Sequence, residues 1–175
     1  MIFEGKVWKF GDNISTDLMM PGSEVHTRSD ISAEEAARKY CMLNNRPGWA
    51  STVQKGDIIV AGRNFGCGSS RPAVILVKAL GISIVIVDSI SRLFFRNAIK
   101  NGFPVLICEG VSALFEEGDV VRVNVETGEV KNLTKDKAIW GEPLPPNSPP
   151  AEILKAGGLE AYLDTVRVQD LSPGS

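Results

Sequence analysis

The stretch GRNFGCGSSRP, residues 62–72, decides how the middle of this chain folds. It joins two apolar runs, DIIVAG at 57–62 and PAVILVKALG at 72–81. The first run is typical of a strand, and the second of a helix that has Pro72 at or near its first turn and ends at Gly81. The stretch is therefore predicted to be the loop of a strand–loop–helix unit, at the edge where open α/β folds bind their ligands.

The loop combines backbone freedom with polar groups. Its glycines permit positive φ angles and close backbone approach: Gly62, Gly66 and Gly68. If the helix begins directly after the loop, Ser69, Ser70 and Arg71 lie at its N-terminus, where free N–H groups and the helix dipole favour an anion. Arg71 adds a planar fork that matches a carboxylate or phosphate. From the pattern alone, an anion site and a tight structural turn with a serine N-cap are equally good interpretations.

Two other interpretations of the loop are weaker. It matches neither the phosphate motif GxxxxGKS/T, because no lysine follows the glycines, nor the spaced GxGxxG of dinucleotide folds, so nucleotide binding is disfavoured. Cys67 could be a thiolate nucleophile, but no histidine lies in a motif near it, and small cysteines beside glycines are often simply buried.

The flanking pattern predicts the fold class. ISIVIVDS at 82–89 and FPVLICEG at 103–110 are apolar β-branched runs typical of buried strands, and the segment between them, 90–102, indicates a helix. Alternating strands and helices imply right-handed crossovers and a parallel arrangement. The segment DVVRVNVETGEVKNLT at 119–134 predicts a β-hairpin around its TG turn. We therefore predict an α/β fold with a mixed, mostly parallel sheet flanked by helices.

The rest of the chain is consistent with one domain over residues 1–170. Residues 1–10 are predicted to contain a short strand, and Ser32 with Glu35 forms a capping-box pattern at the start of a helix. Residues 18–50 otherwise lack a clear period, and we expect them to form a mobile loop region of functional importance. The last helical segment is broken by a glycine pair, and residues 171–175 are predicted to be a disordered tail.

Composition excludes several classes of protein. The 175 residues contain 19 Lys plus Arg against 21 Asp plus Glu, without a basic cluster, so a nucleic-acid partner is not expected. The N-terminus lacks the apolar core of a signal peptide, and no run reaches the ~18 apolar residues of a membrane helix, which predicts a cytoplasmic protein without membrane contact. Three scattered cysteines and one histidine provide no ligand set for a metal or an iron–sulfur cluster in this chain.

Three of these segments together resemble one known protein family. GRNFGCGSSR, with DNISTD upstream and SISRLFFRNAIKNGFPVL downstream, resembles the small subunit of isopropylmalate dehydratase, the counterpart of the swivelling C-terminal domain of aconitase. The resemblance implies a swivelling β/β/α domain and a hydro-lyase of leucine biosynthesis that interconverts 2- and 3-isopropylmalate through an enoate. It also implies a large subunit as partner. That subunit would hold a 4Fe–4S cluster acting as Lewis acid, and this chain would be active only with it.

The resemblance also implies roles for particular residues. Ser69 corresponds to the catalytic base, and Ser70 and Arg71 to groups that hold a substrate carboxylate. A serine is a poor base at neutral pH, so this role requires nearby positive charge and N–H donors. Asp17, in STD, matches an active-site aspartate, although capping a turn or helix explains it nearly as well.

Arg96 and Asn97, in FFRNA, match a family motif as candidate substrate-binding residues, with the polar face of a helix as an equal alternative.

The chain departs from the family pattern at two places. GSSRPAVILV is one residue shorter than the usual segment after Arg71, and GSEVHT replaces the common ARYL loop that faces the substrate side chain. His26 and Arg28 are therefore candidate substrate contacts, although a solvated loop histidine is the more ordinary interpretation. The substrate stays open among isopropylmalate and the acids of homoaconitase, dimethylmalate and methylmalate-type dehydratases.

A non-catalytic carboxylate-binding module is the main alternative from another functional class. It would use the same loop without chemistry and bind its ligand as an isolated chain. Whether the isolated chain forms a homo-oligomer is open.

Overall fold

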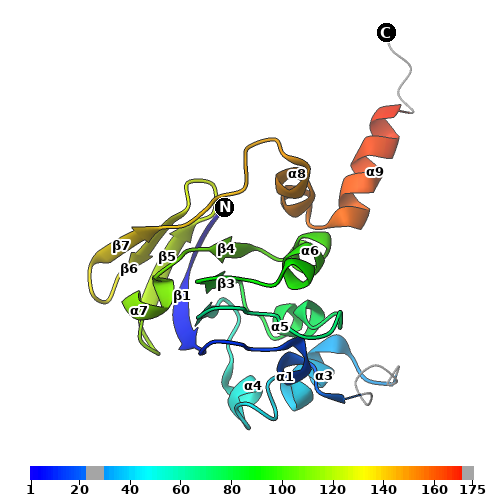
Figure 1. The fold of residues 1–175 in the computed structure, drawn as a ribbon. Helices are drawn as coiled ribbons and strands as arrows, with labels where there is room; N and C mark the ends of the chain where they lie inside the picture. Colours follow the sequence, from blue (N-terminus) through cyan, green and yellow to red (C-terminus); the bar gives the residue numbers. More distant parts are fainter. Residues whose placement is uncertain (23–29, 171–175) are drawn as a thin grey trace.

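The computed structural model describes residues 1–22 and 30–170, and Figure 1 shows their arrangement. His26, Arg28 and the predicted tail 171–175 lie outside the described residues. The strands are β1 (Ile2–Lys9), β2 (Ile58–Ala61), β3 (Ile84–Val87), β4 (Val105–Ile107), β5 (Val120–Asn124), β6 (Glu129–Asn132) and β7 (Lys137–Trp140). The described helices are α1 (Thr16–Met19), α3 (Ala33–Tyr40), α4 (Trp49–Thr52), α5 (Val74–Ala79), α6 (Arg92–Lys100), α7 (Val111–Leu114), α8 (Pro149–Ala156) and α9 (Leu159–Asp170).

The strands form one seven-stranded sheet with the order β4-β3-β2-β1-β5-β6-β7. Strands β1 to β4 pair in parallel, whereas β5, β6 and β7 continue the sheet in antiparallel fashion from the other edge of β1. An isolated bridge joins Ile107 of β4 to Glu142, so the chain leaving β7 returns to the β4 edge. The sheet is mixed, as predicted, but it is partly rather than mostly parallel, because three of its six strand pairs are antiparallel.

Hydrophobic side chains pack on both faces of the parallel strands. Ile59 and Val85 belong to a core that also contains side chains of α3, α4, α5 and α6. In Figure 1, α5 and α6 lie to the right of the parallel strands. Ile58 and Ile84, the neighbours of Ile59 and Val85, belong to a second core that α7 and strands β5 and β6 complete. Because side chains on both faces are buried, β2 and β3 consist of uninterrupted apolar residues.

Most predicted elements are present. The capping box of α3 forms: the Glu35 amide donates to Ser32 Oγ at 3.1 Å, and the Ser32 amide donates to the Glu35 carboxylate at 2.9 Å. The hairpin is β5–β6, and the terminal helical segment breaks at Gly157, which has a φ of 93° and separates α8 from α9. Strand β7 and the four-residue helices α1, α4 and α7 were not predicted, because short elements without a period leave little local signal.

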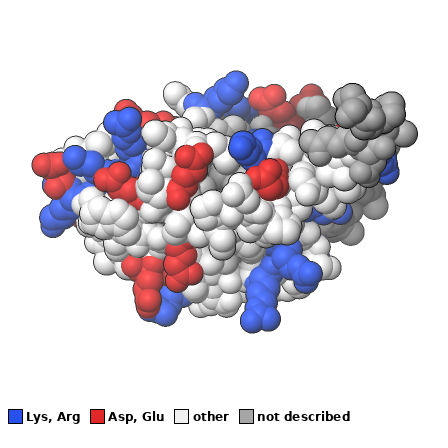
Figure 2. All heavy atoms as spheres, turned by 90° about the horizontal axis from the view of Figure 1, so that it is seen from above, with Lys and Arg blue, Asp and Glu red and all other residues white. Residues whose placement is uncertain are grey.

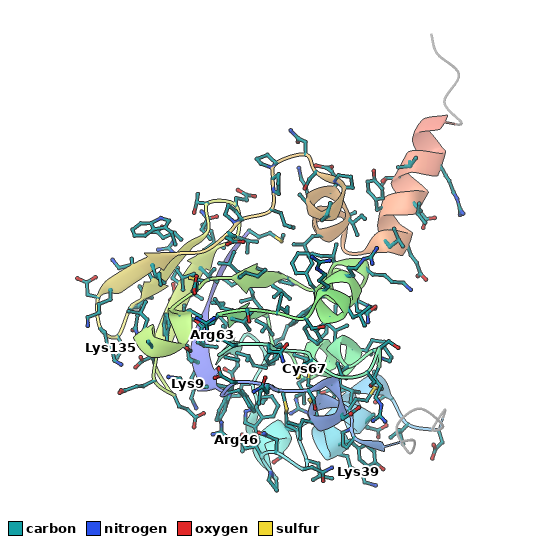
Figure 3. The ribbon with its side chains drawn as sticks, viewed as in Figure 1. Lys9, Lys39, Arg46, Arg63, Cys67 and Lys135 are labelled. Carbon is teal, nitrogen blue, oxygen red and sulfur yellow. The ribbon has the colours of Figure 1, made fainter. Side chains whose placement is uncertain are left out.

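The predicted loop region 18–50 contains α3 and α4 in its described part. Trp49 and Met42 are buried in the core, and Arg46 pairs with Glu117 next to the end of β1. Figure 3 shows Arg46 and Lys9 near one another at this end of the molecule. Residues 30–50 therefore pack on the domain, and their mobility stays a prediction for solution measurements.

The molecular surface in Figure 2 carries charges of both signs. On this face, Lys and Arg side chains alternate with Asp and Glu side chains and with wide uncharged areas. Such a face differs from the continuous basic surface that binds a phosphate backbone. Among the described residues, none of the helices is long and apolar enough to cross a membrane.

The close approach of Gly66 to α6 predicts a large effect of one methyl group. Gly66 has a φ of +75°, and a Cβ there would lie 2.3 Å from Cβ of Phe94, a buried residue that packs edge-on against Phe65. Gly48 has a similar φ of +81° but nothing within 4 Å. We expect Gly48→Ala to cost about 1 kcal/mol of unfolding free energy and Gly66→Ala about 3 kcal/mol or more, measured by thermal and urea unfolding. Equal losses in the two variants would contradict the packing argument.

The Arg46–Glu117 pair predicts a pH dependence of stability. A hydrogen bond from Arg46 to the Glu117 carboxylate, at 2.6 Å, is the largest cause that holds the pKa of Glu117 below its usual value. A lowered carboxyl pKa stabilises the fold above the unfolded pKa, and this contribution is lost as the pH falls through the folded pKa.

Wild type should therefore exceed Glu117→Gln in stability at neutral pH by less than about 1 kcal/mol, because the pair is partly exposed. The difference, measured by urea unfolding, should shrink as the pH falls through the folded pKa of Glu117 and vanish below it. A difference that persists there would show that charge is not its cause.

Candidate functional site

Two segments far apart in the sequence are joined at the carboxyl ends of β1 and β2. These strands are parallel neighbours, and the loops that follow them continue the pairing as an isolated parallel bridge between Ser15 and Cys67. Three backbone hydrogen bonds of 2.7–2.8 Å hold the loops together: Asn13 N to Arg63 O, Gly66 N to Ile14 O and Thr16 N to Cys67 O. We call residues 12–17 and 62–71 the paired loops.

The paired loops need unusual backbone conformations. Asn13 and Asn64 have φ angles of 56° and 58°. The side-chain Nδ2 of Asn64 donates to Oδ1 of Asn13 at 3.0 Å. Asparagine tolerates this left-handed region better than most residues do. The loop after β3 joins the same edge, because the Ser91 amide donates to Phe65 O at 2.8 Å. The glycines and asparagines of the two motifs thus allow the loops at the ends of three strands to meet.

The paired loops bring Ser69, Asp17 and Arg71 together. Ser69 Oγ donates to Asp17 Oδ1 at 3.1 Å, and Arg71 Nε lies 3.2 Å from the same oxygen. Arg71 also donates from Nη1 to the carbonyl of Met20 at 3.0 Å. Thr16 Oγ1 lies 2.9 Å from the Ser69 carbonyl oxygen and 3.3 Å from Ser69 Oγ. We call Ser69, Asp17 and Arg71 the serine cluster.

The expected helix N-terminus at Ser69–Arg71 is wrong. Helix α5 begins at Val74, with Ala73 as its N-cap residue, and the Ala73 amide donates to the Arg71 carbonyl at 2.8 Å. The physical reason is Pro72, because the residue before a proline is sterically disfavoured in the helical region. The cationic group at the site is therefore the Arg71 side chain, and α5, six residues long, provides no anion-binding end to these residues.

The serine cluster lies on an open surface. Gly68, Ser69 and Ser70 are exposed, and the side chains of Asp17 and Arg71 are 56% and 32% exposed. A hydroxyl, a carboxylate and a guanidinium at these distances can bind a small carboxylate and take part in proton transfer. Because Ser69 and Ser70 are exposed to water, another molecule has to cover them before the site can be desolvated.

Arg96 and Asn97 do not join the serine cluster. Arg96 is exposed on α6, where it lines a shallow hollow with Ile90, Arg92, Phe95 and Ile107. Asn97 is partly buried, and its carbonyl accepts from the Asn101 side chain at 2.7 Å. In the part of the chain that the structure describes, no hydrogen bond or ion pair connects either residue to Ser69, Asp17 or Arg71. Their substrate-binding role stays a prediction.

The cysteines of the chain do not suit a metal cluster. Burial raises the pKa of Cys41 to about 12, and burial followed by the charge of Asp88 raises that of Cys108 to about 11, so both resist forming the thiolates that iron requires. Cys67 is partly buried, and Figure 3 marks its place. Within the described ranges, His, Cys, Asp and Glu side chains form no group of three that could hold a metal ion.

Two residues that build the site have roles that the sequence did not indicate. Thr16 is buried at 2% exposure and contacts Ser69, and Gly68 has a φ of +99° and lies against Thr16. Gly68 was recognised only as a flexible position. Thr16 could have been considered as a site residue because it lies between Ser15 and Asp17 in the motif DNISTD, on which the resemblance rests.

Comparisons with known proteins cover the segments that form this site. The family model for the aconitase C-terminal domain matches residues 14–108, which include both paired loops except for the first two residues. The chain is 47% identical over 164 residues to the isopropylmalate/citramalate isomerase small subunit of Methanocaldococcus jannaschii, covering 93% of this chain and 94% of that one. The chain belongs to the isopropylmalate dehydratase small-subunit family.

Further family members support the assignment along the whole chain. The 3-isopropylmalate dehydratase small subunit of Heliobacterium modesticaldum is 45% identical over 166 residues, covering 94% of this chain and 96% of the relative. A crystal structure of 3-isopropylmalate dehydratase from Methanocaldococcus jannaschii has a TM-score of 0.88 at 38% identity and covers 97% of this chain and 98% of that one. The fold of this family member is therefore that of the aconitase C-terminal domain.

Differences in burial predict how the cysteines react. Cys67 is partly exposed, whereas Cys41 and Cys108 are 2% and 0% exposed and have raised pKa values. A thiol reagent such as dithionitrobenzoate should label one cysteine in the folded chain and all three in denaturant. Cys67→Ser should abolish labelling of the folded chain. Rapid native labelling of Cys41 or Cys108 would contradict the burial described here.

Proposed function

We propose that this chain is the small subunit of an isopropylmalate dehydratase, a hydro-lyase that interconverts 2- and 3-isopropylmalate through an enoate. The observation that carries the proposal is the serine cluster, exposed at one edge of a domain whose family is that of isopropylmalate dehydratase small subunits. Its three side chains come from the two motifs on which the resemblance rests. The protein would work in the cytoplasm.

Ser69 is the proposed base that removes the proton next to a substrate carboxylate. Its Oγ donates to Asp17. The negative charge of that carboxylate would by itself disfavour negative charge on Ser69 Oγ. Arg71, 3.2 Å from the same carboxylate oxygen, offsets this negative charge. The guanidinium also has N–H groups beyond those bound to Asp17 and Met20, which can hold the substrate carboxylate beside Ser69.

The large subunit is the proposed second wall of the site. Ser69 and Ser70 are exposed, and covering them would exclude water and strengthen the interaction of Arg71 with a carboxylate. We also assign the 4Fe–4S cluster to the large subunit, because Cys41 and Cys108 are buried with raised pKa values. Residues 18–50 would order fully against that partner and the substrate.

Citramalate is a second candidate substrate. One relative, at 47% identity, is named an isopropylmalate/citramalate isomerase small subunit. The two acids differ in the size of an apolar substituent, which a pocket can discriminate by roughly 1–3 kcal/mol. Residues 23–28, which are expected to face this substituent, lie outside the described residues. A substrate panel therefore has to include both acids and the larger dicarboxylates.

The decisive variants are Ser69→Ala and Ser70→Ala, which remove neighbouring hydroxyls. In the complex with a cluster-loaded large subunit, Ser69→Ala should lower kcat about 10²- to 10⁴-fold, as expected for loss of a general base. Ser70→Ala should raise KM several-fold and leave kcat nearly unchanged, because it removes only a substrate contact. Turnover is followed anaerobically by ultraviolet absorbance of the enoate.

Arg63 provides the matched control for the cationic group. Arg63 lies in the same loop as Arg71, is 66% exposed and pairs with Glu109. We therefore expect Arg63→Ala to leave turnover unchanged. Arg71→Ala should abolish turnover. Full turnover by Ser69→Ala in an intact complex would refute the catalytic proposal. Carboxylate binding by the isolated chain that Ser69→Ala leaves unchanged would favour the binding module instead.

A further inference from the structure

Thr16 is a polar residue that is almost completely buried beside the serine cluster, at 2% exposure. Its backbone amide donates to the carbonyl of Cys67 at 2.8 Å, and its hydroxyl donates to the carbonyl of Ser69 at 2.9 Å. These two bonds hold the second loop on both sides of Gly68. A hydroxyl at this depth is expected to have a specific partner, because burying it without one is costly.

The hydroxyl of Thr16 is not needed for the helix in which it lies. Helix α1 begins at Thr16, and its N-cap is Ser15, whose hydroxyl accepts from the Leu18 amide at 3.2 Å. Gly68 fits closely against Thr16, since a Cβ at that glycine would lie 3.4 Å from Thr16 Oγ1. The contacts of the Thr16 side chain therefore serve the loop that carries Ser69.

Counting protons determines the direction of the hydrogen bonds. A backbone carbonyl and an ionised carboxylate can only accept, and each hydroxyl has one proton to give. If Thr16 gives its proton to the Ser69 carbonyl, then Ser69 is free to give its own proton to Asp17, 3.1 Å away. If Ser69 instead donated to Thr16, two oxygen atoms, Ser69 Oγ and Asp17 Oδ1, would face each other without a proton between them.

We propose that Thr16 is a positioning residue for Ser69. Its hydroxyl fixes the Ser69 carbonyl and leaves Thr16 Oγ1 without a proton to give to Ser69 Oγ, 3.3 Å away. The Asp17 carboxylate is the stronger of the two acceptors near Ser69 Oγ, so the Ser69 proton points to it and can pass to it as Ser69 Oγ takes the proton from the substrate carbon. This inference rests on the proposed catalytic role of Ser69.

Two variants separate positioning from packing. Thr16→Val keeps the shape and removes the hydroxyl, whereas Thr16→Ser keeps the hydroxyl and removes a buried methyl group. In the complex with the large subunit, we expect Thr16→Val to lower kcat about tenfold, as for the loss of one hydrogen bond, with KM changed less than about twofold. Thr16→Ser should keep kcat within about twofold of wild type. A role in packing alone predicts the opposite order, because the serine leaves a cavity and the valine does not.

A second measurement follows the loop without any chemistry. Cys67 is held by the amide of Thr16 and is partly exposed, so its rate of labelling by dithionitrobenzoate reports how firmly the loop is held. In the folded isolated chain, Thr16→Val should label Cys67 several-fold faster than wild type and Thr16→Ser should not. Thermal unfolding of each variant confirms that the domain is folded at the assay temperature.

The outcomes distinguish this inference from the proposed function. Wild-type turnover and labelling in Thr16→Val would overturn the positioning role while leaving the role of Ser69 intact. A loss in Thr16→Ser equal to or greater than that in Thr16→Val would also overturn it, in favour of packing. If Ser69→Ala turns over at the wild-type rate, the catalytic role of Ser69 is wrong and the positioning role falls with it.

Discussion

The backbone hydrogen bonds between the paired loops are the constraint on which the rest of the site depends. They extend the parallel pairing of β1 with β2 beyond the ends of the strands, through the amides of Asn13, Gly66 and Thr16. Backbone groups next to a core need partners, so the loops cannot separate without leaving several of them unpaired. As a consequence Asp17 and Ser69, which are 52 residues apart in the chain, lie within hydrogen-bond distance.

Arg71 gives the site its charge. Pro72 keeps Arg71 out of α5, and its side chain turns back to Asp17 and the Met20 carbonyl on the first loop. The cation is then placed beside Ser69 by side-chain contacts, and an exposed ion pair of this kind contributes little to stability. The cluster is accordingly suited to exchange partners, as the proposed binding of a substrate carboxylate requires, which a buried and fully paired arginine would not be.

Elements with local sequence signals were predictable, whereas contacts between distant segments were not. The strands β2 and β3 were predictable because their apolar runs are continuous, and α3 because its capping box is local. Asp17 and Ser69 were both singled out, but only family resemblance linked them, since no period or spacing relates two loops so far apart. The position of Ser69 at a helix N-terminus was wrong because the effect of Pro72 on Arg71 was underestimated. Thr16 was missed because a threonine in a turn-rich motif gives no sign that it will be buried.

The sequence by itself determined the order of the longer strands and helices, the flexible positions of the loops and the identity of the polar side chains in them. These properties follow from interactions between residues close in the chain, such as caps, prolines and hydrophobic periods. Only the tertiary structure decided which polar groups of the site come within hydrogen-bond distance, and that Thr16 reaches Ser69. The physical reason is that these contacts depend on the register between β1 and β2, where Val7 lies opposite Ile58, and that register is set by packing the two cores on both faces of the sheet.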